Sequence, residues 1–143
     1  KLIVDAIENY KPENNRSQLI RTKHNQVVMD AYNANPTSME LALKNFVKSD
    51  HPHKMLILGD MLELGMESEA EHRKILRLAA NLDFSGILLV GPEFSKLADM
   101  HLMKSFLTNG EAMNYLTTHP VRNHFILIKG SRGIGLEKVL EAL

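Results

Sequence analysis

The stretch DAYNANPTSME, residues 30–40, joins an apolar run to the start of a helix and indicates the class of fold. Residues 26–29 before it form a short extended run, and apolar side chains after it recur at helical spacing to about residue 48. Asn35 is a typical N-cap residue, and Pro36 suits the first turn of a helix. A strand that leads through a polar loop into a helix is the building unit of α/β domains.

The rest of the chain repeats this unit. We predict a hairpin from residues 17–22 and 26–29 and further strands at 55–58, 87–90, 104–107 and 125–128. We predict helices at 93–100, 108–117 and 136–143, and another that starts near residue 68. Residues 68–71 and 108–111 have the spacing of capping boxes. Continuous apolar strands separated by amphipathic helices favour a parallel sheet that is covered on both faces. The predicted fold is therefore α/β, a Rossmann-like, open and mostly parallel sheet with an N-terminal β-hairpin.

Composition narrows the functional classes. The 143 residues suit one compact domain, and 17 basic residues balance 17 acidic ones, which argues against a general nucleic-acid binder. The chain has no cysteine, so disulfides and thiolate metal sites are excluded, and its seven histidines show no zinc pattern, so we predict no metal site. No apolar run approaches the roughly 20 residues that span a bilayer.

The first residues do not resemble a signal peptide, because their apolar part is too short. Residues 1–10 have the spacing of a short helix, and residues 11–15, which include Pro12, read as a connector. Since the chain begins with Lys1 rather than Met, we interpret it as a piece of a longer protein. Residues 1–13 would then be the end of a preceding domain or a hinge, and residues 14–143 the domain itself.

Four polar loops follow predicted strands. They are DAYNANP, LGDMLELG (58–65), GPEFS (91–95) and KGSRG (129–133). In open α/β sheets, ligands bind outside the carboxyl ends of the strands. We therefore expect these loops to lie along one edge of the sheet and to hold the functional residues.

The residues in and before the first loop suit a nucleotide, although each also has a structural interpretation. The carboxylate of Asp30 could accept hydrogen bonds from ribose hydroxyls, or it could be a turn acid. The amides of Asn33 and Asn35 could contact a base or a phosphate, while Asn35 could equally be only a helix cap. Tyr32 could stack on a ring or pack under the loop. The guanidinium of Arg16, in NNRSQ, has paired N–H donors that suit a phosphate. An exposed arginine in a polar connector is, however, usually just solvated.

The later loops carry charge of both signs. Asp60 and Glu63 could bind a substrate ammonium or a metal, or simply be solvated. His72 shares a helix face with apolar residues, so it points inward, either as a satisfied buried histidine or as a substrate contact. In KGSRGIG, Lys129, Ser131 and Arg132 favour an anion site, although the string matches neither GxGxxG nor the GxxxxGK[ST] phosphate loop. The alternative is a glycine-rich turn in which Lys129 and Arg132 are simply exposed bases.

Taken together, NNRSQ, DAYNANPTSM, LGDMLELG with His72 downstream, and KGSRG followed by LE resemble the C-terminal domain of the Mur ligase family, from about residue 14 to the end. Two of these strings, DAYNANP and LGDMLELG, are typical of the branch that joins D-alanyl-D-alanine to UDP-N-acetylmuramoyl-tripeptide. The resemblance implies an ATP-dependent amide ligase of peptidoglycan precursor synthesis in the bacterial cytoplasm. It also implies a partnership with N-terminal and central domains of the same protein.

The resemblance also implies roles for individual residues. Arg16 would reach the γ-phosphate of ATP, Asp30 would take the ribose hydroxyls, and Tyr32, Asn33, Asn35 and Pro36 would line the nucleotide. The dipeptide would be received by Asp60, Glu63, His72, Lys129, Ser131 and Arg132. The phosphate loop and the main Mg²⁺ ligands belong to the central domain in this family. The chain alone is therefore expected to bind ATP weakly and to be inactive.

Two alternatives stay open at this point. One is another amide ligase of the superfamily, similar to folylpolyglutamate synthases, for which an HNP-type string in place of NANP would be expected. The other is a non-catalytic, Rossmann-type nucleotide-binding module. A phosphate loop of the GTNGKT type encoded upstream would favour a ligase over the module.

Overall fold

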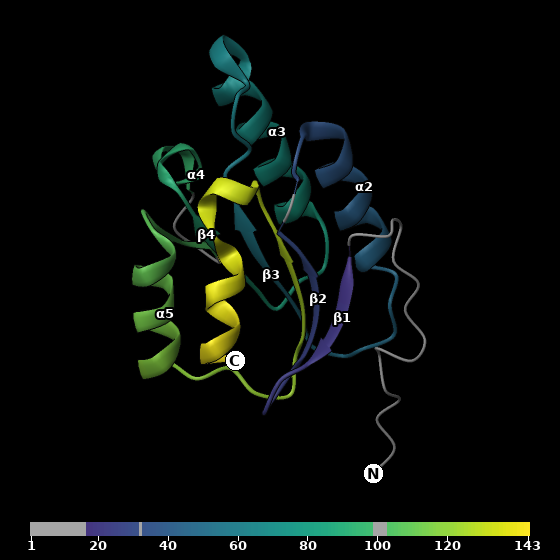
Figure 1. The fold of residues 1–143 in the computed structure, drawn as a ribbon. Coiled ribbons are helices and arrows are strands. Elements are labelled where there is room, and N and C mark those ends of the chain that lie inside the picture. The colour runs from purple at the N-terminus through teal and green to yellow at the C-terminus, as the bar shows by residue number, and fades with distance from the viewer. Residues whose placement is uncertain (1–16, 32, 99–102) are drawn as a thin grey trace.

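The computed structural model describes residues 17–31, 33–98 and 103–143. The expected helix and connector at residues 1–15, together with Arg16 and Tyr32, lie outside these residues. The described part contains one six-stranded sheet in the order β1-β2-β6-β3-β4-β5 (Figure 1). Its strands are β1 (Gln18–Arg21), β2 (Gln26–Asp30), β3 (Lys54–Gly59), β4 (Gly86–Val90), β5 (Met103–Phe106) and β6 (Phe125–Lys129). β1 pairs antiparallel with β2, and the other four pairings are parallel, which confirms the predicted hairpin and sheet.

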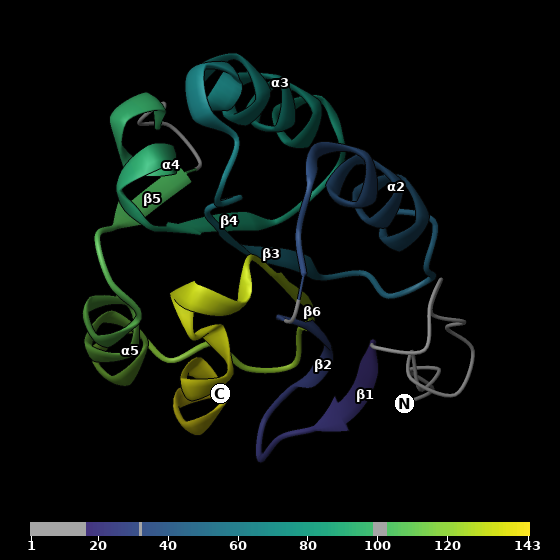
Figure 2. The same ribbon diagram turned by 45° about the horizontal axis from the view of Figure 1, so that its top comes forward.

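Helices cover both faces of this sheet, as Figure 2 shows. The α-helices are α2 (Pro36–Phe46), α3 (Ser68–Asn81), α4 (Pro92–Leu97) and α5 (Asn109–Thr118), and the 3₁₀ segments are η1 (Gly65–Glu67), η2 (Arg132–Ile134) and η3 (Leu136–Ala142). α2, α3 and α4 pack on one face, while α5 and η3 pack on the other. Strand side chains alternate between the two cores, so Phe125 and Leu127 join the first and Ile126 and Ile128 the second.

Some element ends differ from the prediction. The segment after residue 135 is a 3₁₀ helix rather than an α-helix, because i→i+3 bonds such as Lys138 N–H to the Gly135 carbonyl (3.3 Å) tighten it. In this geometry residues three apart lie one above the other, which directs both Leu136 and Val139 to the sheet. The helix predicted from residue 93 begins at Pro92 and ends at Leu97, earlier than expected.

Of the two predicted capping boxes, one is wrong and the other is half formed. Ser68 lies inside α3, because η1 continues directly into that helix and Glu67 holds the cap position. Thr108 does cap α5, accepting the Glu111 N–H at 3.2 Å. The Glu111 carboxylate, however, accepts the N–H of Leu107 and not that of Thr108.

The strand register places the four polar loops along one edge of the sheet. Asp30, at the end of β2, lies beside Lys129 at the end of β6, and Lys129 lies beside Leu58 of β3. Gly59 lies beside Val90 at the end of β4. The loops that follow these strands therefore share this edge, at the top of Figure 1, as predicted. We call it the carboxyl edge.

Candidate functional site

A buried ion pair joins the first and last loops of the carboxyl edge. The ammonium of Lys129 lies 2.6 Å from Asp30 Oδ2 and 3.4 Å from the backbone carbonyl oxygen of Asn33. Lys129 is 1% exposed, so it is not the exposed base that a glycine-rich turn suggests. Ser17 Oγ also donates to Asp30 Oδ2, at 3.4 Å. The side-chain contacts of Asp30 within the described residues thus fall on one carboxylate oxygen.

The DAYNANP loop is fixed at its far end by a helix cap. Asn35 Oδ1 accepts the Ser38 N–H at 2.9 Å, and Ser38 Oγ accepts the Asn35 N–H at 3.1 Å, which completes a capping box at the start of α2. Ala34 is buried, whereas Asn33 and Asn35 are exposed. Pro36 occupies the first turn of α2, as predicted. The loop therefore leaves Asn33 and Asn35 exposed while the cap holds its far end in place.

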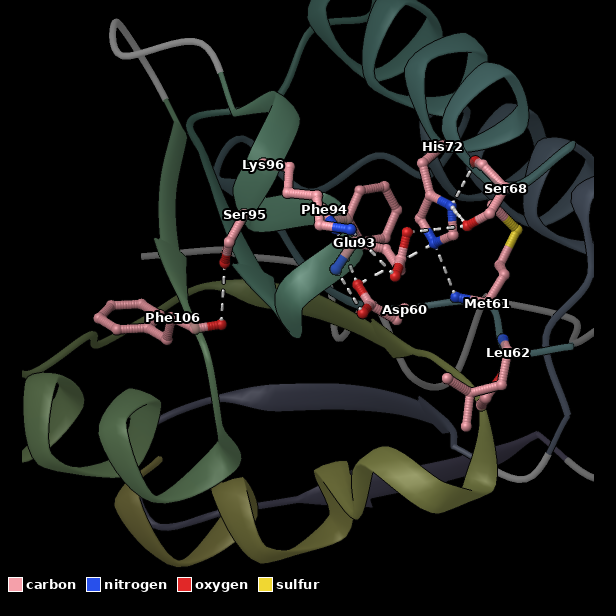
Figure 3. Close-up of polar contacts among 11 residues, drawn as sticks. Asp60, Met61, Leu62, Ser68, His72, Glu93, Phe94, Ser95, Lys96 and Phe106 are labelled. Carbon is pink, nitrogen blue, oxygen red and sulfur yellow. Dashed lines mark hydrogen bonds and ion pairs between the residues drawn. The ribbon is translucent and has the colours of Figure 1, made fainter. Parts of the chain in front are cut away.

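Asp60 is fully buried and caps α4. Its Oδ2 accepts the Glu93 N–H at 2.8 Å, and its Oδ1 accepts the Phe94 N–H at 2.9 Å (Figure 3). A side chain on Gly91, whose φ is +125°, would overlap this carboxylate, so only glycine fits there. Burial raises the pKa of Asp60 above its ordinary value, although the two N–H groups that donate to its carboxylate oppose the shift.

His72 is a completely buried histidine with both ring nitrogens occupied. Nε2 accepts the Met61 N–H at 3.0 Å, while Nδ1 lies 2.8 Å from the Ser68 carbonyl oxygen. A carbonyl oxygen only accepts, so Nδ1 carries the proton and the ring is neutral. The 4.0 Å separation between Nε2 and Asp60 Oδ1 is therefore not an ion pair. Of the two interpretations of His72, the structure favours the satisfied buried histidine, which holds the LGDMLELG loop through Met61.

Ser131 connects the last loop to the LGDMLELG loop. Its N–H donates to the Asp60 carbonyl oxygen at 3.0 Å, and its Oγ accepts the Leu62 N–H at 2.9 Å. The two loops also touch through glycine, since a Cβ on Gly130 would lie 2.8 Å from the Gly59 Cα. Glu63, with φ of +66°, and Arg132 follow these contacts in their loops, and both side chains are exposed.

Two positioning residues escape the sequence patterns. Glu93 Oε1 accepts a hydrogen bond from Ser68 Oγ at 3.0 Å, which links the start of α4 to the start of α3 (Figure 3). Asn109 Nδ2 donates to the carbonyl oxygens of Ile134 (2.8 Å) and Gly135 (3.2 Å), and so supports KGSRGIG from α5. Both contacts join residues 25 or 26 positions apart, and no local signal marks them. The GPEFS loop itself was recognised as part of the edge.

Metal clusters and membrane-spanning helices are both absent from the described residues. No group of three or more histidine or acidic side chains there is placed to hold a metal ion. Nor does any helix in residues 17–31, 33–98 and 103–143 have the length and apolarity to cross a membrane.

The fold and the carboxyl edge define a class: an α/β domain with helices on both faces of its sheet and four polar loops along one edge. Residues 15–132 match the sequence model of the family described as "Mur ligase, glutamate ligase domain". The chain therefore belongs to the Mur ligase family, and the region matched is its C-terminal domain.

Curated relatives agree with this assignment. The chain is 32% identical over 130 residues to the UDP-N-acetylmuramoyl-tripeptide–D-alanyl-D-alanine ligase of Rickettsia prowazekii, covering 88% of the chain and 29% of that protein. It is 31% identical to the enzyme of the same name from Escherichia coli K12, covering 98% of the chain and 32% of that protein. The chain thus spans about a third of the length of these relatives.

Solved structures show the same fold. MurF from Acinetobacter baumannii superposes with a TM-score of 0.75 at 32% identity, over 92% of this chain and 30% of that one. MurF ligase from Thermotoga maritima, solved in complex with ADP, gives a TM-score of 0.75 at 23% identity, over 92% of this chain and 31% of that one. The second likeness supports the fold alone.

Proposed function

We propose that the chain is the C-terminal domain of an ATP-dependent ligase that joins D-alanyl-D-alanine to UDP-N-acetylmuramoyl-tripeptide in the bacterial cytoplasm. The names of its curated relatives support this reaction. The observation that carries the proposal is the carboxyl edge, where loops far apart in the sequence meet through Asp30 with Lys129 and Asp60 with Ser131. The N-terminal and central domains of the same protein would complete the cleft.

The nucleotide half would form around DAYNANP. With Oδ2 of Asp30 held by Lys129, its Oδ1 is the oxygen proposed to accept the ribose hydroxyls. Asn33 and Asn35 would line the nucleotide, with Tyr32 and Pro36 beside the adenine. Arg16 would reach the γ-phosphate, where a guanidinium stabilises the transferring group.

The described residues fit a nucleotide better than they fit Mg²⁺. Asp30 and Asp60, the buried acids of the edge, are already engaged by an ammonium and by two backbone N–H groups. We therefore propose that Mg²⁺, which neutralises phosphate charge, is held mainly by the central domain. ATP would activate the terminal carboxylate of the tripeptide as an acyl phosphate, which the amine of the dipeptide attacks with release of phosphate.

The dipeptide half would form between LGDMLELG and KGSRG. D-alanyl-D-alanine carries an amino group and a carboxylate, and the exposed Glu63 and Arg132 offer complementary charges on the two joined loops. Ser131 lies at the junction and is 9% exposed. We propose that Asp60 and His72, which are both fully buried, serve substrate binding by fixing the loop rather than by touching the dipeptide.

Activity of the complete protein tests the proposal. It would be assayed with UDP-N-acetylmuramoyl-tripeptide, ATP and D-alanyl-D-alanine. The variants compared are Arg16→Ala and Asp30→Asn. The control is Glu40→Gln, which changes a side chain on the solvent side of α2. The Asn variant removes the charge of Asp30 but keeps a side-chain oxygen that can still accept a hydrogen bond from Lys129. We expect Asp30→Asn to raise the KM for ATP and Arg16→Ala to lower kcat, with Glu40→Gln unchanged.

Two results would contradict the proposal. Rates of both variants equal to the wild type would remove the assigned roles of Arg16 and Asp30. Ligase turnover by the 143-residue chain alone would show that no further domain is needed for catalysis.

A further inference from the structure

An open pocket lies at the edge of the sheet opposite the four polar loops. It has a volume of about 230 Å³ and lies between the β1–β2 turn, the segment before β6 and His51 ahead of β3. Its lining consists of Arg21, Thr22, Lys23, His24, Asn25, Gln26, His51, Asn123 and His124. Gln26 and Phe125, at the starts of β2 and β6, are register partners, whereas Asp30 and Lys129 pair at the opposite ends. At about 3.3 Å per residue, four residues of strand separate the two edges by about 13 Å.

Basic side chains and histidines make up much of the lining of this pocket. Five of its nine residues are basic or histidine, and none of the nine, all of which belong to the described part, is acidic. The chain as a whole has no net charge, so this concentration is local. Closely spaced cationic donors in a concave site attract and hold small anions.

Part of this lining is rigid. Asn25 is 5% exposed, and its Nδ2 donates to the Val121 carbonyl oxygen at 2.8 Å while its Oδ1 accepts the His124 N–H at 3.0 Å. The Asn25 N–H in turn donates to Thr22 Oγ1 at 3.0 Å. These bonds tie the β1–β2 turn to the segment before β6, which are opposite walls of the pocket. The backbone that carries the basic side chains of the pocket is therefore fixed at the turn.

The histidines have their hydrogen-bond directions partly fixed. His51 Nδ1 accepts the His53 N–H at 3.0 Å, which leaves Nε2 as the nitrogen that donates. His51 is 8% exposed, and burial together with His53 and His124 lowers its pKa below the ordinary value. Burial and nearby positive groups disfavour the charged form of this imidazole. An anion bound beside the ring would stabilise that charged form.

We propose that this pocket binds a small phosphate-bearing anion, either inorganic phosphate or a short phosphate monoester. The charge of the lining favours a doubly charged oxyanion with several acceptor oxygens. The volume limits its size, because pockets that enclose drug-sized ligands span about 300–1,000 Å³ while one water takes about 30 Å³. This proposal rests on the residues that line the pocket and does not depend on the proposed ligase function.

Nuclear magnetic resonance of the 143-residue chain tests this site directly. Inorganic phosphate and glycerol phosphate would be titrated in separate arms, with the imidazole signals of His24, His51 and His124 as reporters. We expect saturable shifts at these histidines. Lys23→Ala and His51→Gln should each weaken binding about tenfold, the loss of one charge-assisted hydrogen bond. Lys74→Ala, on the exposed side of α3, is the matched charge control and should bind as the wild type does.

The outcomes separate the possibilities. Tighter binding of glycerol phosphate than of phosphate would identify an organic phosphate as the ligand, and equal or weaker binding would identify the free ion. Shifts that do not saturate, or that Lys74→Ala reduces as much as Lys23→Ala does, would overturn the proposal. So would phosphate shifts confined to the carboxyl edge. Because Lys23 is exposed, its variant keeps the test valid even where His51→Gln alters folding.

Discussion

Asp30 and Asp60 look alike in the sequence, since each follows an apolar strand and opens a polar loop, but the structure engages them differently. The carboxylate of Asp30 meets the ammonium of Lys129 through Oδ2, and its side chain keeps 6% of its surface exposed. Both oxygens of the Asp60 carboxylate accept hydrogen bonds from backbone N–H groups of α4, and the side chain is fully buried. From this difference we propose that Asp30 is the acid that takes a ligand and that Asp60 shapes the edge.

The two partners also imply different energetics. A buried ion pair loses the hydration of both charges, and it is stable only while both partners remain. A carboxylate at a helix N-terminus instead satisfies donors that would otherwise be unpaired, and it lies at the positive end of the helix dipole. Removing the Lys129 side chain should therefore destabilise the domain because the buried Asp30 carboxylate is left unpaired. Removing the Asp60 side chain should destabilise it because two N–H groups of α4 are left without acceptors.

The largest effect is expected for Lys129→Met. The unpaired Asp30 carboxylate should lower the free energy of unfolding by about 4 kcal/mol. Urea denaturation of the variant measures this loss. Lys44→Met, which breaks the exposed Lys44–Glu40 pair at 2.7 Å, is the control and should cost only about 0.5 kcal/mol. Asp30→Asn added to Lys129→Met should recover much of the loss, and a double variant no more stable than Lys129→Met would contradict the ion-pair account.

Next comes Asp60→Ala, which leaves the N–H groups of Glu93 and Phe94 buried without acceptors. We expect a loss of about 3 kcal/mol in unfolding free energy, since each unpaired buried group costs about 1–3 kcal/mol. Hydrogen exchange at these two amides should also accelerate relative to the amides of α3. Equal protection of both amides in variant and wild type would show that Asp60 does not cap α4.

Gly91→Ala tests the same cap from the other side. The φ of +125° and the overlap with the Asp60 carboxylate predict a loss of about 2 kcal/mol. In an Asp60→Ala background the new methyl group meets no carboxylate, so the same substitution should cost less there. Denaturation of the two single variants and the double variant gives this coupling, and strictly additive losses would argue against the contact.

Much of the fold follows from local patterns in the sequence. The apolar runs at residues 55–58, 87–90 and 125–128 predict the central strands because only buried parallel strands need such continuous apolarity. Asn35 and Pro36 predict the start of α2 because the cap contacts lie within three residues. The carboxyl edge follows in turn, since parallel strands must bring their ends together.

The details of the site depend on contacts that no local pattern records. Asp30 and Lys129 are 99 residues apart and meet only because β2 and β6 are neighbours in the sheet. Ser68 has the spacing of a cap, but η1 leads directly into α3, and its hydroxyl donates to Glu93. The roles assigned to Arg16 and Tyr32 stay predictions, because both lie outside the described residues.

The smallest effect expected is a change with pH in the free energy of unfolding, compared between the wild type and a variant in which residue 60 cannot ionise. Burial raises the pKa of Asp60 in the folded state above its value in the unfolded chain, so the folded state binds this proton more tightly. Stability from this group is therefore greatest below the unfolded pKa and falls as pH rises through the folded pKa.

Asp60→Asn provides the comparison, because it keeps the shape of the side chain but does not titrate. From neutral pH down toward the ordinary pKa of aspartate, the unfolding free energy of the wild type should rise relative to that of Asp60→Asn. Urea denaturation of both proteins at a series of pH values measures the difference, in which the titration of the other carboxylates cancels. A difference that falls on acidification would mean that the two N–H groups that donate to Asp60 outweigh burial. Asp60 would then resemble an ordinary stabilised carboxylate, and the contrast with Asp30 would lie only in which groups hold it.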